Sequence, residues 1–476
     1  MLLTSPELPR PSRAAVEKAL SLLERKLGPS KVLSERDSLE AYANDDSEGH
    51  GCMPDAVVLA RTPEDILAAL AVAREAQVPI TPRSGGTGRT GGSIPIAGGI
   101  VITTLGMNQI KDLDTREGIV VVEPGMVLGD LHSTVEAEGW FYPPDPNSWS
   151  SCALGGNVAE NAAGPRAFKY GATRNYVLGV DTFLIGGQRF FAGRHTVKGV
   201  TGYDVTSLLV GSEGTLAVFG DITLRLVPKP ESVMTLLALF GDVHQAGTAV
   251  EELTSRGIVP RCIELLDRGT LDAMRAAGNP INVLAGAMLL MDVDGNEAEC
   301  ELQAEKISDA CDTAQVLELL VAQDAAQRER LWSARREMSL AVRRLTKHKV
   351  SEDVVVPRRE MGELLRRVDT SSEKHRVRAL TYGHAGDGNL HVNFLWDDDD
   401  EIPRVQACVE KLFRDTIELR GTLSGEHGIG ILKAPYLPLE QSSELIALQQ
   451  SIKAVFDPQG LLNPGKIFPQ KSHTAC

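Results

Sequence analysis

The sequence predicts an α+β fold that is divided over more than one domain. Its 476 residues form a chain that ordinarily divides into two or three domains. Short strands alternate with helices in the first half, and a strand–helix–strand order occurs twice in the second half. Hydrophobic residues make up 42% of the chain, which is enough to bury large cores and excludes a disordered protein.

The first half combines β-branched strands with well-marked helix starts. A helix is expected over residues 63–76, because Thr62-Pro63-Glu64-Asp65 supplies a cap, a first-turn proline and two acids. The segment Pro228-Lys229-Pro230 follows the last strand of this half and marks a domain joint. Strands are expected over residues 55–60, 100–104, 119–122 and 221–227.

The second half repeats one unit. Two strand–helix–strand units in succession suggest a ferredoxin-like sheet with helices on one face. A long helix is expected after them, over residues 324–345. The two units are expected at residues 233–240, 243–256 and 263–266, and at residues 282–293, 297–312 and 315–321.

Charge and cysteine usage exclude several classes of function. A formal charge of −15 disfavours nucleic acid and anionic membrane as partners. No apolar run approaches the roughly 20 residues that cross a bilayer, and the first residues do not read as a secretory signal. The seven cysteines are scattered without a Cys-x-x-Cys pair, so neither disulfides nor an iron–sulfur cluster is expected. A cytoplasmic location is expected, with membrane association through a partner as the alternative.

A glycine-rich loop matches the dinucleotide pattern G-x-G-x-x-G from Gly86 to Gly91. A Rossmann site needs a helix at the last glycine, but paired glycines and Pro95 follow here. The loop is therefore expected to join two strands. Its bare backbone N–H groups can still surround an anion, so we expect it to bind phosphate rather than to be a flexible turn.

Two histidines stand in the segment TYGHAGDGNLHVNF, residues 381–394. Strand alternation places His391 and Asn393 on one face, and three glycines allow the chain to bring His384 near His391. Two imidazoles and a carboxylate suit a divalent metal, and Glu426 in Gly425-Glu426-His427 is a candidate carboxylate. The alternative is a glycine-rich hairpin with packed histidines.

Six motifs in one order make a family resemblance. They are PRSGGTGRTGG (82–92), YPPDPNSWSSCALGGNVAENAAG (142–164), TGYDVTSLLVGSEGTLAV (201–218), GHAGDGNLH (383–391), GEHGIG (425–430) and LLNPGK (461–466). From about Pro54 to Pro469 the chain resembles the FAD-dependent 2-hydroxy-acid dehydrogenases. That family belongs to the flavoprotein superfamily of vanillyl-alcohol oxidase and p-cresol methylhydroxylase.

The resemblance implies a two-subdomain FAD-binding domain over 1–228, a ferredoxin-like substrate-capping domain with a metal site over 229–434, and a segment over 435–476 that returns to the FAD domain. Covalent relatives carry histidine where this chain has Thr87, so non-covalent FAD is expected. The implied cofactor-binding residues are Arg83, Ser84, Gly85, Gly86, Thr87, Gly88, Gly91, Gly92, Pro144, Gly155, Gly156, Asn157, Asn161, Gly164, Glu213, Gly214, Val218 and Asn463.

The resemblance also assigns roles at the substrate. It implies that His384, His391 and Glu426 bind a divalent metal, with Zn²⁺ expected and Mn²⁺ or Fe²⁺ in relatives. We expect His427 to be the general base, with an orienting role as the alternative. Arg335 matches the family's arginine for the substrate carboxylate, although it could also face solvent. Asn393 is a weaker candidate for the polar groups of the substrate.

The expected reaction is oxidation of a small D-2-hydroxy acid to the 2-oxo acid, with hydride transfer to N5 of FAD. The segment Ser351–Pro357 favours the lactate or glycolate type, while Lys349 keeps D-2-hydroxyglutarate as the alternative. No nicotinamide site is apparent, so the acceptor is expected to be a quinone, an electron-transfer flavoprotein or an iron–sulfur subunit. A homodimer is expected. The alternatives outside this class are a metal-dependent hydrolase and a passive FAD electron-transfer module.

Overall fold

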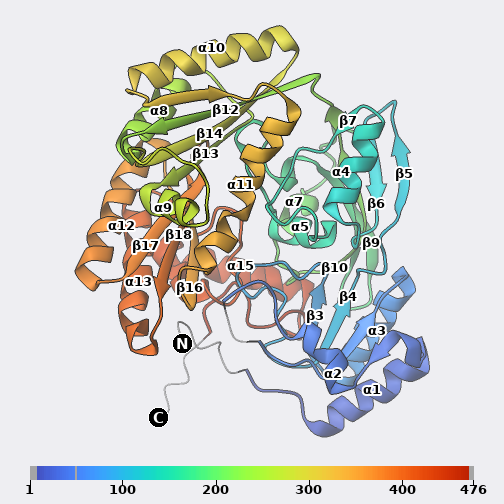
Figure 1. Ribbon diagram of the computed structural model, residues 1–476. Helices are drawn as coiled ribbons and strands as arrows, with labels where there is room; N and C mark the ends of the chain where they lie inside the picture. The colour runs from blue at the N-terminus through green and yellow to red at the C-terminus, as the bar shows by residue number, and fades with distance from the viewer. Residues whose placement is uncertain (1–7, 49–50, 471–476) are drawn as a thin grey trace. The chain divides into compact units, whose positions relative to one another are not determined.

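The computed structural model describes residues 8–48 and 51–470 of the chain. The chain divides into two compact units, which are described separately (Figure 1). Of these described residues, the N-terminal unit comprises 8–48, 51–162, 172–229 and 426–470. The central unit comprises residues 163–171 and 230–425.

The N-terminal unit begins with a four-stranded sheet. Its strands β2, β4 and β3 are parallel, and β1 pairs with β2 in the antiparallel sense. Helices α1 (Arg13–Leu27) and α3 (Pro63–Ala76) cover one face, and α2 (Arg36–Leu39) lies on the other. In spatial order the strands are β1 (Val32–Leu33), β2 (Ala56–Leu59), β4 (Ile100–Thr103) and β3 (Ile80–Arg83).

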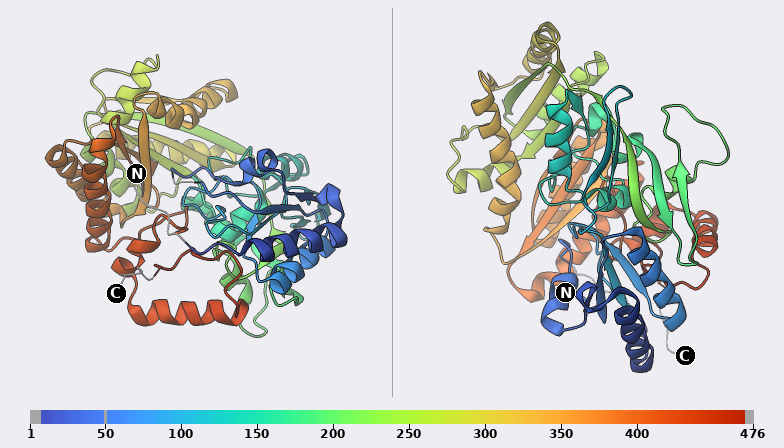
Figure 2. Two further views of the ribbon diagram at one scale, coloured as in Figure 1. Left: turned by 90° about the horizontal axis from the view of Figure 1, so that it is seen from below. Right: turned by 90° about the vertical axis from the view of Figure 1, so that its right-hand side faces the viewer.

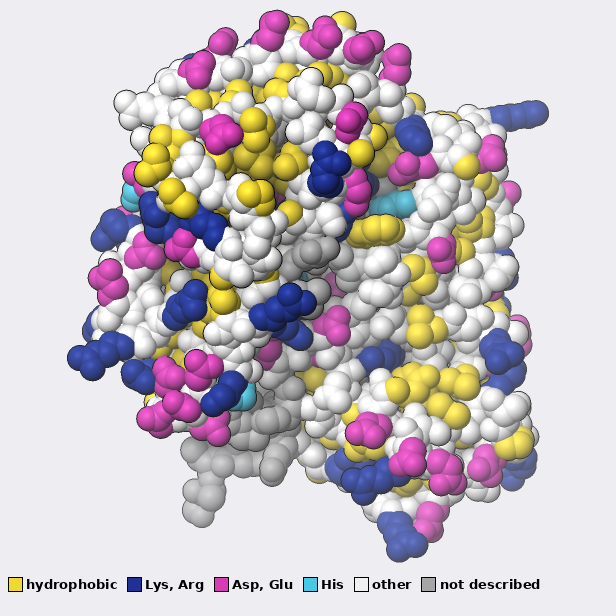
Figure 3. Space-filling view, in the orientation of Figure 1, with side chains coloured by type: hydrophobic (Ala, Val, Ile, Leu, Met, Phe, Trp, Pro, Cys, Tyr) yellow, Lys and Arg dark blue, Asp and Glu magenta, His cyan; other side chains and the backbone are white. Residues whose placement is uncertain are grey.

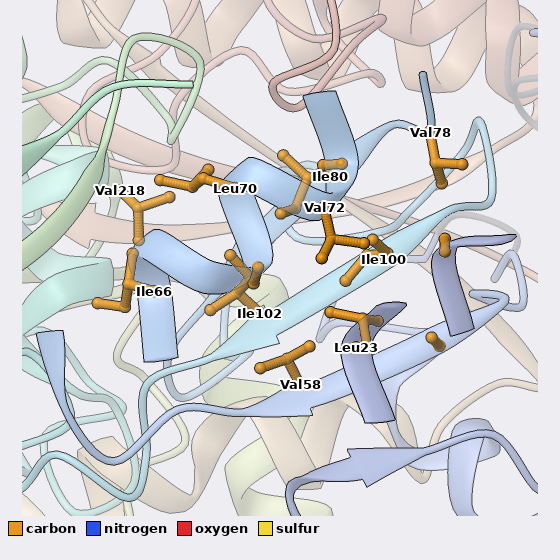
Figure 4. Packing of buried hydrophobic residues seen from close by; sticks show 14 of the residues in the cluster. Leu23, Val58, Ile66, Leu70, Val72, Val78, Ile80, Ile100, Ile102 and Val218 are labelled. Atoms are coloured by element: carbon orange, nitrogen blue, oxygen red, sulfur yellow. The ribbon is translucent and has the colours of Figure 1, made fainter. Parts of the chain in front are cut away.

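The helix α3 starts where the sequence predicts and packs through one apolar stripe. The Thr62 hydroxyl accepts the N–H of Asp65, and the Asp65 carboxylate accepts the N–H of Thr62. Figure 4 shows Ile66 and Leu70 of α3 in the cluster that also contains Ile102 of β4. This cluster forms the core of the first sheet.

We expect Leu70→Ala to lower the free energy of unfolding by about 2–5 kcal/mol. Leu70 has no exposed surface, so its removal leaves a cavity in addition to the lost burial. Urea unfolding followed by circular dichroism measures the change. Leu67→Ala, on a half-buried position of the same helix, is the matched control and should have a smaller effect.

The second sheet of the N-terminal unit is antiparallel throughout and is flanked by short helices. In the same unit, β7 (Trp140–Phe141) and β11 (Val227–Pro228) form a separate two-stranded ribbon. The strands in spatial order are β5 (Ile110–Asp114), β6 (Ile119–Val122), β10 (Val218–Arg225), β8 (Val177–Phe183) and β9 (Arg189–Gly193). The helices of this part are α4 (Leu128–Ala137), α5 (Leu154–Glu160) and α7 (Val205–Leu209).

The C-terminal segment of the chain belongs to the N-terminal unit. It carries α14 (Leu437–Glu440) and α15 (Ser443–Phe456). After α15, Leu462 forms a parallel bridge with Ile80 of β3. The segment that follows α15 is thereby attached to the first sheet.

The central unit is built on one antiparallel sheet of seven strands. The spatial order differs from the chain order at both edges, where β15 pairs with β12 and β16 pairs with β18, and in the middle, where β14 lies between β12 and β13. The strands in spatial order are β15 (Glu318–Val321), β12 (Ser232–Phe240), β14 (Ala287–Gly295), β13 (Cys262–Asp267), β17 (Arg378–His384), β18 (Asn389–Trp396) and β16 (His348–Val355).

Helices cover both faces of this sheet, so the expectation of helices on one face is wrong. Four of them lie on one face: α8 (Val243–Ser255), α10 (Glu297–Thr313), α12 (Met361–His375) and α13 (Ile402–Glu418). On the other face lie α9 (Arg268–Ala276), α11 (Ala325–Arg343) and the short α6 (Ala167–Tyr170). Figure 3 shows acidic side chains gathered along α10, which agrees with the acidic character of the chain.

In the described part of the chain, no helix has the length and hydropathy that a bilayer crossing requires.

Candidate functional site

The glycine loop links β3 to β4 without a helix, as the sequence predicts. Gly86 and Gly91 adopt φ of +70° and +82°, which other residues rarely adopt. A Cβ on Gly85 would lie 2.9 Å from the carbonyl oxygen of Ser151, and a Cβ on Gly155 would lie 2.7 Å from Oγ of Ser84. The loop is therefore fitted closely to its neighbours at these glycines, where a larger residue would collide.

The C-terminal segment is bonded to this loop. The Thr90 hydroxyl donates to the carbonyl oxygen of His427 at 3.0 Å, and the N–H of Ile431 donates to the carbonyl oxygen of Thr90 at 2.9 Å. The Glu213 carboxylate accepts the N–H groups of Ile429 and Gly430 at 2.8 and 2.7 Å. The predicted base His427 is thus anchored through its backbone, while its imidazole is not part of these bonds.

Asn463 connects two further predicted residues. Its side-chain amide donates to the carbonyl oxygens of Gly92 and Glu213 at 2.9 and 2.8 Å. Glu213 takes a left-handed φ of +51°, which turns the chain tightly before Gly214. Three predicted residues from distant parts of the sequence therefore meet in one place.

Buried ionisable groups surround this point. Oxygens of Glu160 and Glu213 lie 2.3 and 3.0 Å from the position that a Cβ on Gly428 would take. Burial and the neighbouring Glu213 and Asp45 raise the pKa of Glu160 well above its usual value. Burial lowers the pKa of Lys466 to about 7, against the opposing charges of Asp45 and Glu213. Its ammonium group donates to the carbonyl oxygen of Ile94 at 2.6 Å.

Other predicted cofactor residues lie either in α5 and β3 or away from the glycine loop. Gly155, Gly156 and Asn157 lie in the first turn of α5, and Asn161 ends α5 in the left-handed conformation. Arg83 ends β3 and donates to the carbonyl oxygen of Asn44 at 2.7 Å. Away from the loop, the Pro144 carbonyl bonds to His132, Val218 belongs to the hydrophobic core cluster, and Gly164 lies in the central unit.

The N-terminal unit fits FAD in the character of its donors. Two buried polar atoms beside the predicted residues, Nδ2 of Asn157 and Oγ of Ser212, have no hydrogen-bond partner among the residues that the structure describes. Buried polar groups are normally hydrogen-bonded, so such atoms indicate a missing polar ligand. A flavin and its pyrophosphate present carbonyl, ring-nitrogen and phosphate acceptors that match these donors.

In the central unit, His384 and His391 face each other from the adjacent strands β17 and β18. Their ring centroids are 5.2 Å apart and the ring planes stand at 89°. They lie on the sheet face that α9 and α11 cover at positions such as Leu380 and Leu395. Further along both strands, the residues that point to the same face are histidines and not leucines. This end of the face is therefore polar.

Glu264 of β13 binds both a predicted metal ligand and the predicted substrate arginine. Its carboxylate is 2.5 Å from Nδ1 of His384 and 2.5 Å from a guanidinium nitrogen of Arg335, and Glu264 is fully buried. Burial raises the pKa of Glu264, but the charges and hydrogen bonds of His384 and Arg335 outweigh burial and lower it. Arg335 also lies over the ring of Tyr382 at 5.2 Å.

Asp353 of β16 accepts hydrogen bonds from residues near the C-terminal end of the central unit. Its carboxylate accepts the side-chain amide of Asn389 at 2.5 Å, the hydroxyl of Ser424 at 3.0 Å and the N–H of Gly425 at 2.8 Å. Nδ1 of His391 is 3.7 Å from the same carboxylate, which is too long for a hydrogen bond. Glu426 follows Gly425 directly, and with His427 it begins the return of the chain to the N-terminal unit.

The third predicted catalytic residue, Asn393, is engaged in the sheet. Its side-chain amide donates to the carbonyl oxygen of His391 at 3.0 Å, and it is fully buried. The structure thus brings His384, His391, Arg335 and Asn393 onto one sheet face of the central unit.

Four residues of these sites are absent from the sequence prediction. They are Glu160, Glu264, Asp353 and Lys466. Glu264 had a signal that could have been used, since a lone acid among Cys262, Ile263, Leu265 and Leu266 is unusual for a buried strand. Asp353 offered a similar signal, because it is an acid directly before three consecutive valines.

Two family models match the chain. One is described as an FAD binding domain and matches residues 54–191. The other is described as the C-terminal domain of FAD linked oxidases and matches residues 229–467. Together they cover most of both units.

Among curated proteins, the chain is 39% identical over 432 residues to the glycolate oxidase subunit GlcD of Bacillus subtilis, covering 90% of this chain and 92% of that protein. It is 32% identical to the D-lactate dehydrogenase of Anaerostipes hadrus, covering 93% and 96%. It is 30% identical to the D-2-hydroxyglutarate dehydrogenase of Stutzerimonas stutzeri, covering 96% and 99%.

Solved structures agree in fold. p-Cresol methylhydroxylase with substrate bound aligns over 97% of this chain and 98% of its own, with a TM-score of 0.81 and 16% identity. The 4-ethylphenol oxidase of Gulosibacter chungangensis aligns over 98% and 99%, with a TM-score of 0.79 and 18% identity. The predicted α+β class, with an FAD-binding domain and a C-terminal domain, is confirmed.

Proposed function

Because the chain belongs to the family of FAD-linked oxidases that act on 2-hydroxy acids, we propose that it oxidises a small D-2-hydroxy acid of the lactate or glycolate type. The product is the 2-oxo acid. One observation carries this proposal: a buried carboxylate, Glu264, holds an imidazole and a guanidinium side by side on the polar end of a sheet face.

Each part of that arrangement has a use in the reaction. Arg335 keeps N–H groups beyond its bond to Glu264, and its buried Nε has no hydrogen-bond partner within the described part of the chain. A guanidinium fixed in this way can receive the substrate carboxylate. Arg335 therefore orients the acid, and Glu264 and Tyr382 keep its guanidinium in place.

FAD would be held by the glycine loop, by the first turn of α5 and by the segment around Glu213 and Asn463. When bound, FAD supplies the acceptor for the hydride from C2 of the substrate. The protein supplies backbone N–H groups for the pyrophosphate and amide donors such as Asn157. These residues would hold the cofactor and position its ring.

A divalent metal fits the two histidines of the central unit. Glu264 accepts from Nδ1 of His384, which leaves Nε2 as the ligand atom, and this arrangement is typical of metal-binding histidines. His384, His391 and Glu426 would bind Zn²⁺, Mn²⁺ or Fe²⁺. When bound, the ion supplies a Lewis acid for the hydroxyl and carboxylate of the substrate.

His427 would take the proton of the substrate hydroxyl. Its backbone is fixed by Thr90, while the segment after it is fixed by Glu213, so the imidazole has a defined starting position. A group with an ordinary pKa of about 6.5 can accept a proton near neutral pH. Glu426 and His427 are adjacent in sequence, so one segment would carry both a ligand and the base.

We expect FAD to be bound without a covalent link. Thr87 occupies the position after Arg83-Ser84-Gly85-Gly86, and a threonine hydroxyl does not form the histidyl link that the resemblance describes. Precipitation of the purified yellow protein with acid should release all flavin into the supernatant, which absorbance measures. Flavin that stays with the pellet would contradict this expectation.

The acceptor of the electrons lies outside the chain. The names of two relatives describe subunits of glycolate oxidase, which supports a partner protein that receives the electrons. A quinone or an electron-transfer flavoprotein is the alternative. We place the protein in the cytoplasm, with membrane association through such a partner as the alternative.

An anaerobic substrate panel tests the proposed function. The FAD-loaded protein is mixed with D- and L-lactate, glycolate and D-2-hydroxyglutarate, and the flavin absorbance is followed by stopped flow. We expect fastest bleaching with D-lactate or glycolate. Fastest bleaching with D-2-hydroxyglutarate would favour a role for Lys349, which is buried in β16 and whose charge suits a second carboxylate. No bleaching with any hydroxy acid would contradict the proposal.

A further inference from the structure

The antiparallel sheet of the N-terminal unit ends in two edge strands with different character. The edge strand β5, Ile-Lys-Asp-Leu-Asp, carries Lys111, Asp112 and Asp114, and its register with β6 shifts between Ile110 and Asp112. Charges and irregular register are the usual protection of an edge against pairing with another chain. The edge strand β5 is therefore protected.

The other edge strand, β9, lacks this protection. It reads Arg-Phe-Phe-Ala-Gly and pairs with β8 in regular register over all five residues. Phe190 and Phe191 are each more than a third exposed, and the single charge, Arg189, is bound to Asp181 at 2.9 Å. Within residues 8–48 and 51–470, β8 is the only strand that pairs with β9, so its outer edge presents unpaired backbone groups.

The loop after β9, residues 194–204, extends the apolar edge. Val200 and Tyr203 are 99% and 98% exposed, and the bright-green loop in the right-hand view of Figure 2 projects beyond the sheet. Two hydrogen bonds lie within the loop. Nε of Arg194 donates to the carbonyl oxygen of Thr196 at 3.1 Å, and the Thr196 hydroxyl donates to the carbonyl oxygen of Lys198 at 2.7 Å. The loop thus has internal hydrogen bonds over residues 194–198 and exposes apolar side chains beyond them.

Phe191 links the strand to the loop. Its ring stacks on His195, with centroids 4.5 Å apart and planes at 4°. It also covers Gly179 of β8, where a Cβ would lie 2.3 Å from the ring. A flat aromatic surface therefore lies at the middle of β9.

We propose that β9 pairs in the antiparallel sense with β9 of a second copy of this chain. Two copies related by a twofold axis bring the same edge together in this way, and two five-stranded sheets then become one of ten strands. The loops 194–204 flank the joined strands and bury Val200 and Tyr203. This inference does not depend on the proposed function.

Two features select a second copy as the occupant. With Phe191 at the axis, Arg189 of one copy faces Gly193 of the other, so no like charges meet along the strands. The segment supplies 16 residues a side, close to the roughly 20–30 of a stable interface.

Sedimentation velocity of the FAD-loaded full chain tests the contact. We expect a particle of twice 51.3 kDa for the wild type. The double variant Val200→Asp, Tyr203→Asp should dissociate at least tenfold more readily, because four carboxylates would enter the joined surface. Both residues are almost fully exposed, so folding is not affected, and retained FAD absorbance confirms this. Val455→Asp, on the exposed side of α15, is the matched control.

A crosslink tests the register. Phe191→Cys should form a covalent dimer under mild oxidation, because only a residue at a twofold axis meets itself, and Val455→Cys should not. Five native cysteines are buried and do not compete: Cys152, Cys262, Cys300, Cys311 and Cys408. A monomeric wild type, a dimer that the double variant leaves unchanged, or a Phe191→Cys chain that stays uncrosslinked overturns the inference. A larger assembly that the double variant divides into halves supports it.

Discussion

Replacement of His427 by alanine is expected to slow the reduction of bound FAD by the substrate about 10²–10⁴-fold, the usual contribution of a general base. FAD should remain bound, because the hydrogen bond from Thr90 goes to the backbone carbonyl of His427 and survives the substitution. Anaerobic stopped flow at several substrate concentrations gives the limiting rate of reduction and the apparent substrate affinity separately.

The pH dependence distinguishes a base from an orienting residue. With His427 as the base, the rate of reduction should fall tenfold for each pH unit below its pKa, since the protonated imidazole cannot accept a proton. The alanine variant should lose this limb, and added imidazole should restore part of the rate. A variant that is slow but keeps the acid limb of the profile would assign His427 to orientation only.

His244→Ala is the control for this experiment. His244 is exposed on α8 of the central unit, and its removal should leave the rate of reduction and its pH profile unchanged. If both variants lose activity equally, the loss does not report on the reaction.

Much of the fold could be predicted because local rules agree with the structure. The capping pattern at Thr62 fixed the start of α3, and observed and expected bounds coincide at Pro63–Ala76. The glycines and proline after Gly91 excluded a helix, and the loop indeed joins β3 to β4. The long helix expected over 324–345 is α11, Ala325–Arg343. In each case neighbouring residues determine the outcome.

The partners of the site residues could not be predicted, because they arise from pairing between distant strands. Glu264 meets His384 only because β13 pairs with β17 in the register that sets these two residues opposite each other. Arg335 reaches the same carboxylate from α11. No local pattern reports such a register, so the sequence named the arginine and the histidine without the acid that binds both.

The same reason explains the cluster around Lys466. The sequence identified Asn463-Pro464-Gly465 as a tail that returns to the cofactor, but the burial of the following lysine depends on the fold around it. Asp45 and Glu213 approach it from segments far away in sequence. Family membership is confirmed by the comparisons, whereas the roles of individual site residues stay predictions.

We expect Glu264→Ala to have the largest effect on the central unit. The substitution leaves the Arg335 guanidinium, which is mostly buried, without its carboxylate and also removes the acceptor of Nδ1 of His384. Breaking a buried ion pair in this way destabilises a protein by about 3–5 kcal/mol. Loss of a carboxylate behind a metal-binding histidine lowers metal affinity by about 10–100-fold.

Two measurements separate these effects. Urea unfolding of the metal-free protein gives the change in stability, and metal retained after dialysis against graded chelator gives the change in affinity. Glu264→Gln keeps the volume and one acceptor oxygen, so it should lose less stability than Glu264→Ala. Glu301→Ala, an exposed acid on α10, should change neither quantity.

The pattern of results across the variants assigns the role of Glu264. If both Glu264 variants bind metal as the wild type does, His384 does not depend on Glu264 for its orientation, and the carboxylate serves Arg335 alone. In that case substrate affinity should fall while metal content stays constant. If metal affinity and substrate affinity fall together, one buried carboxylate positions both the ion and the acid, as its contacts with His384 and Arg335 imply.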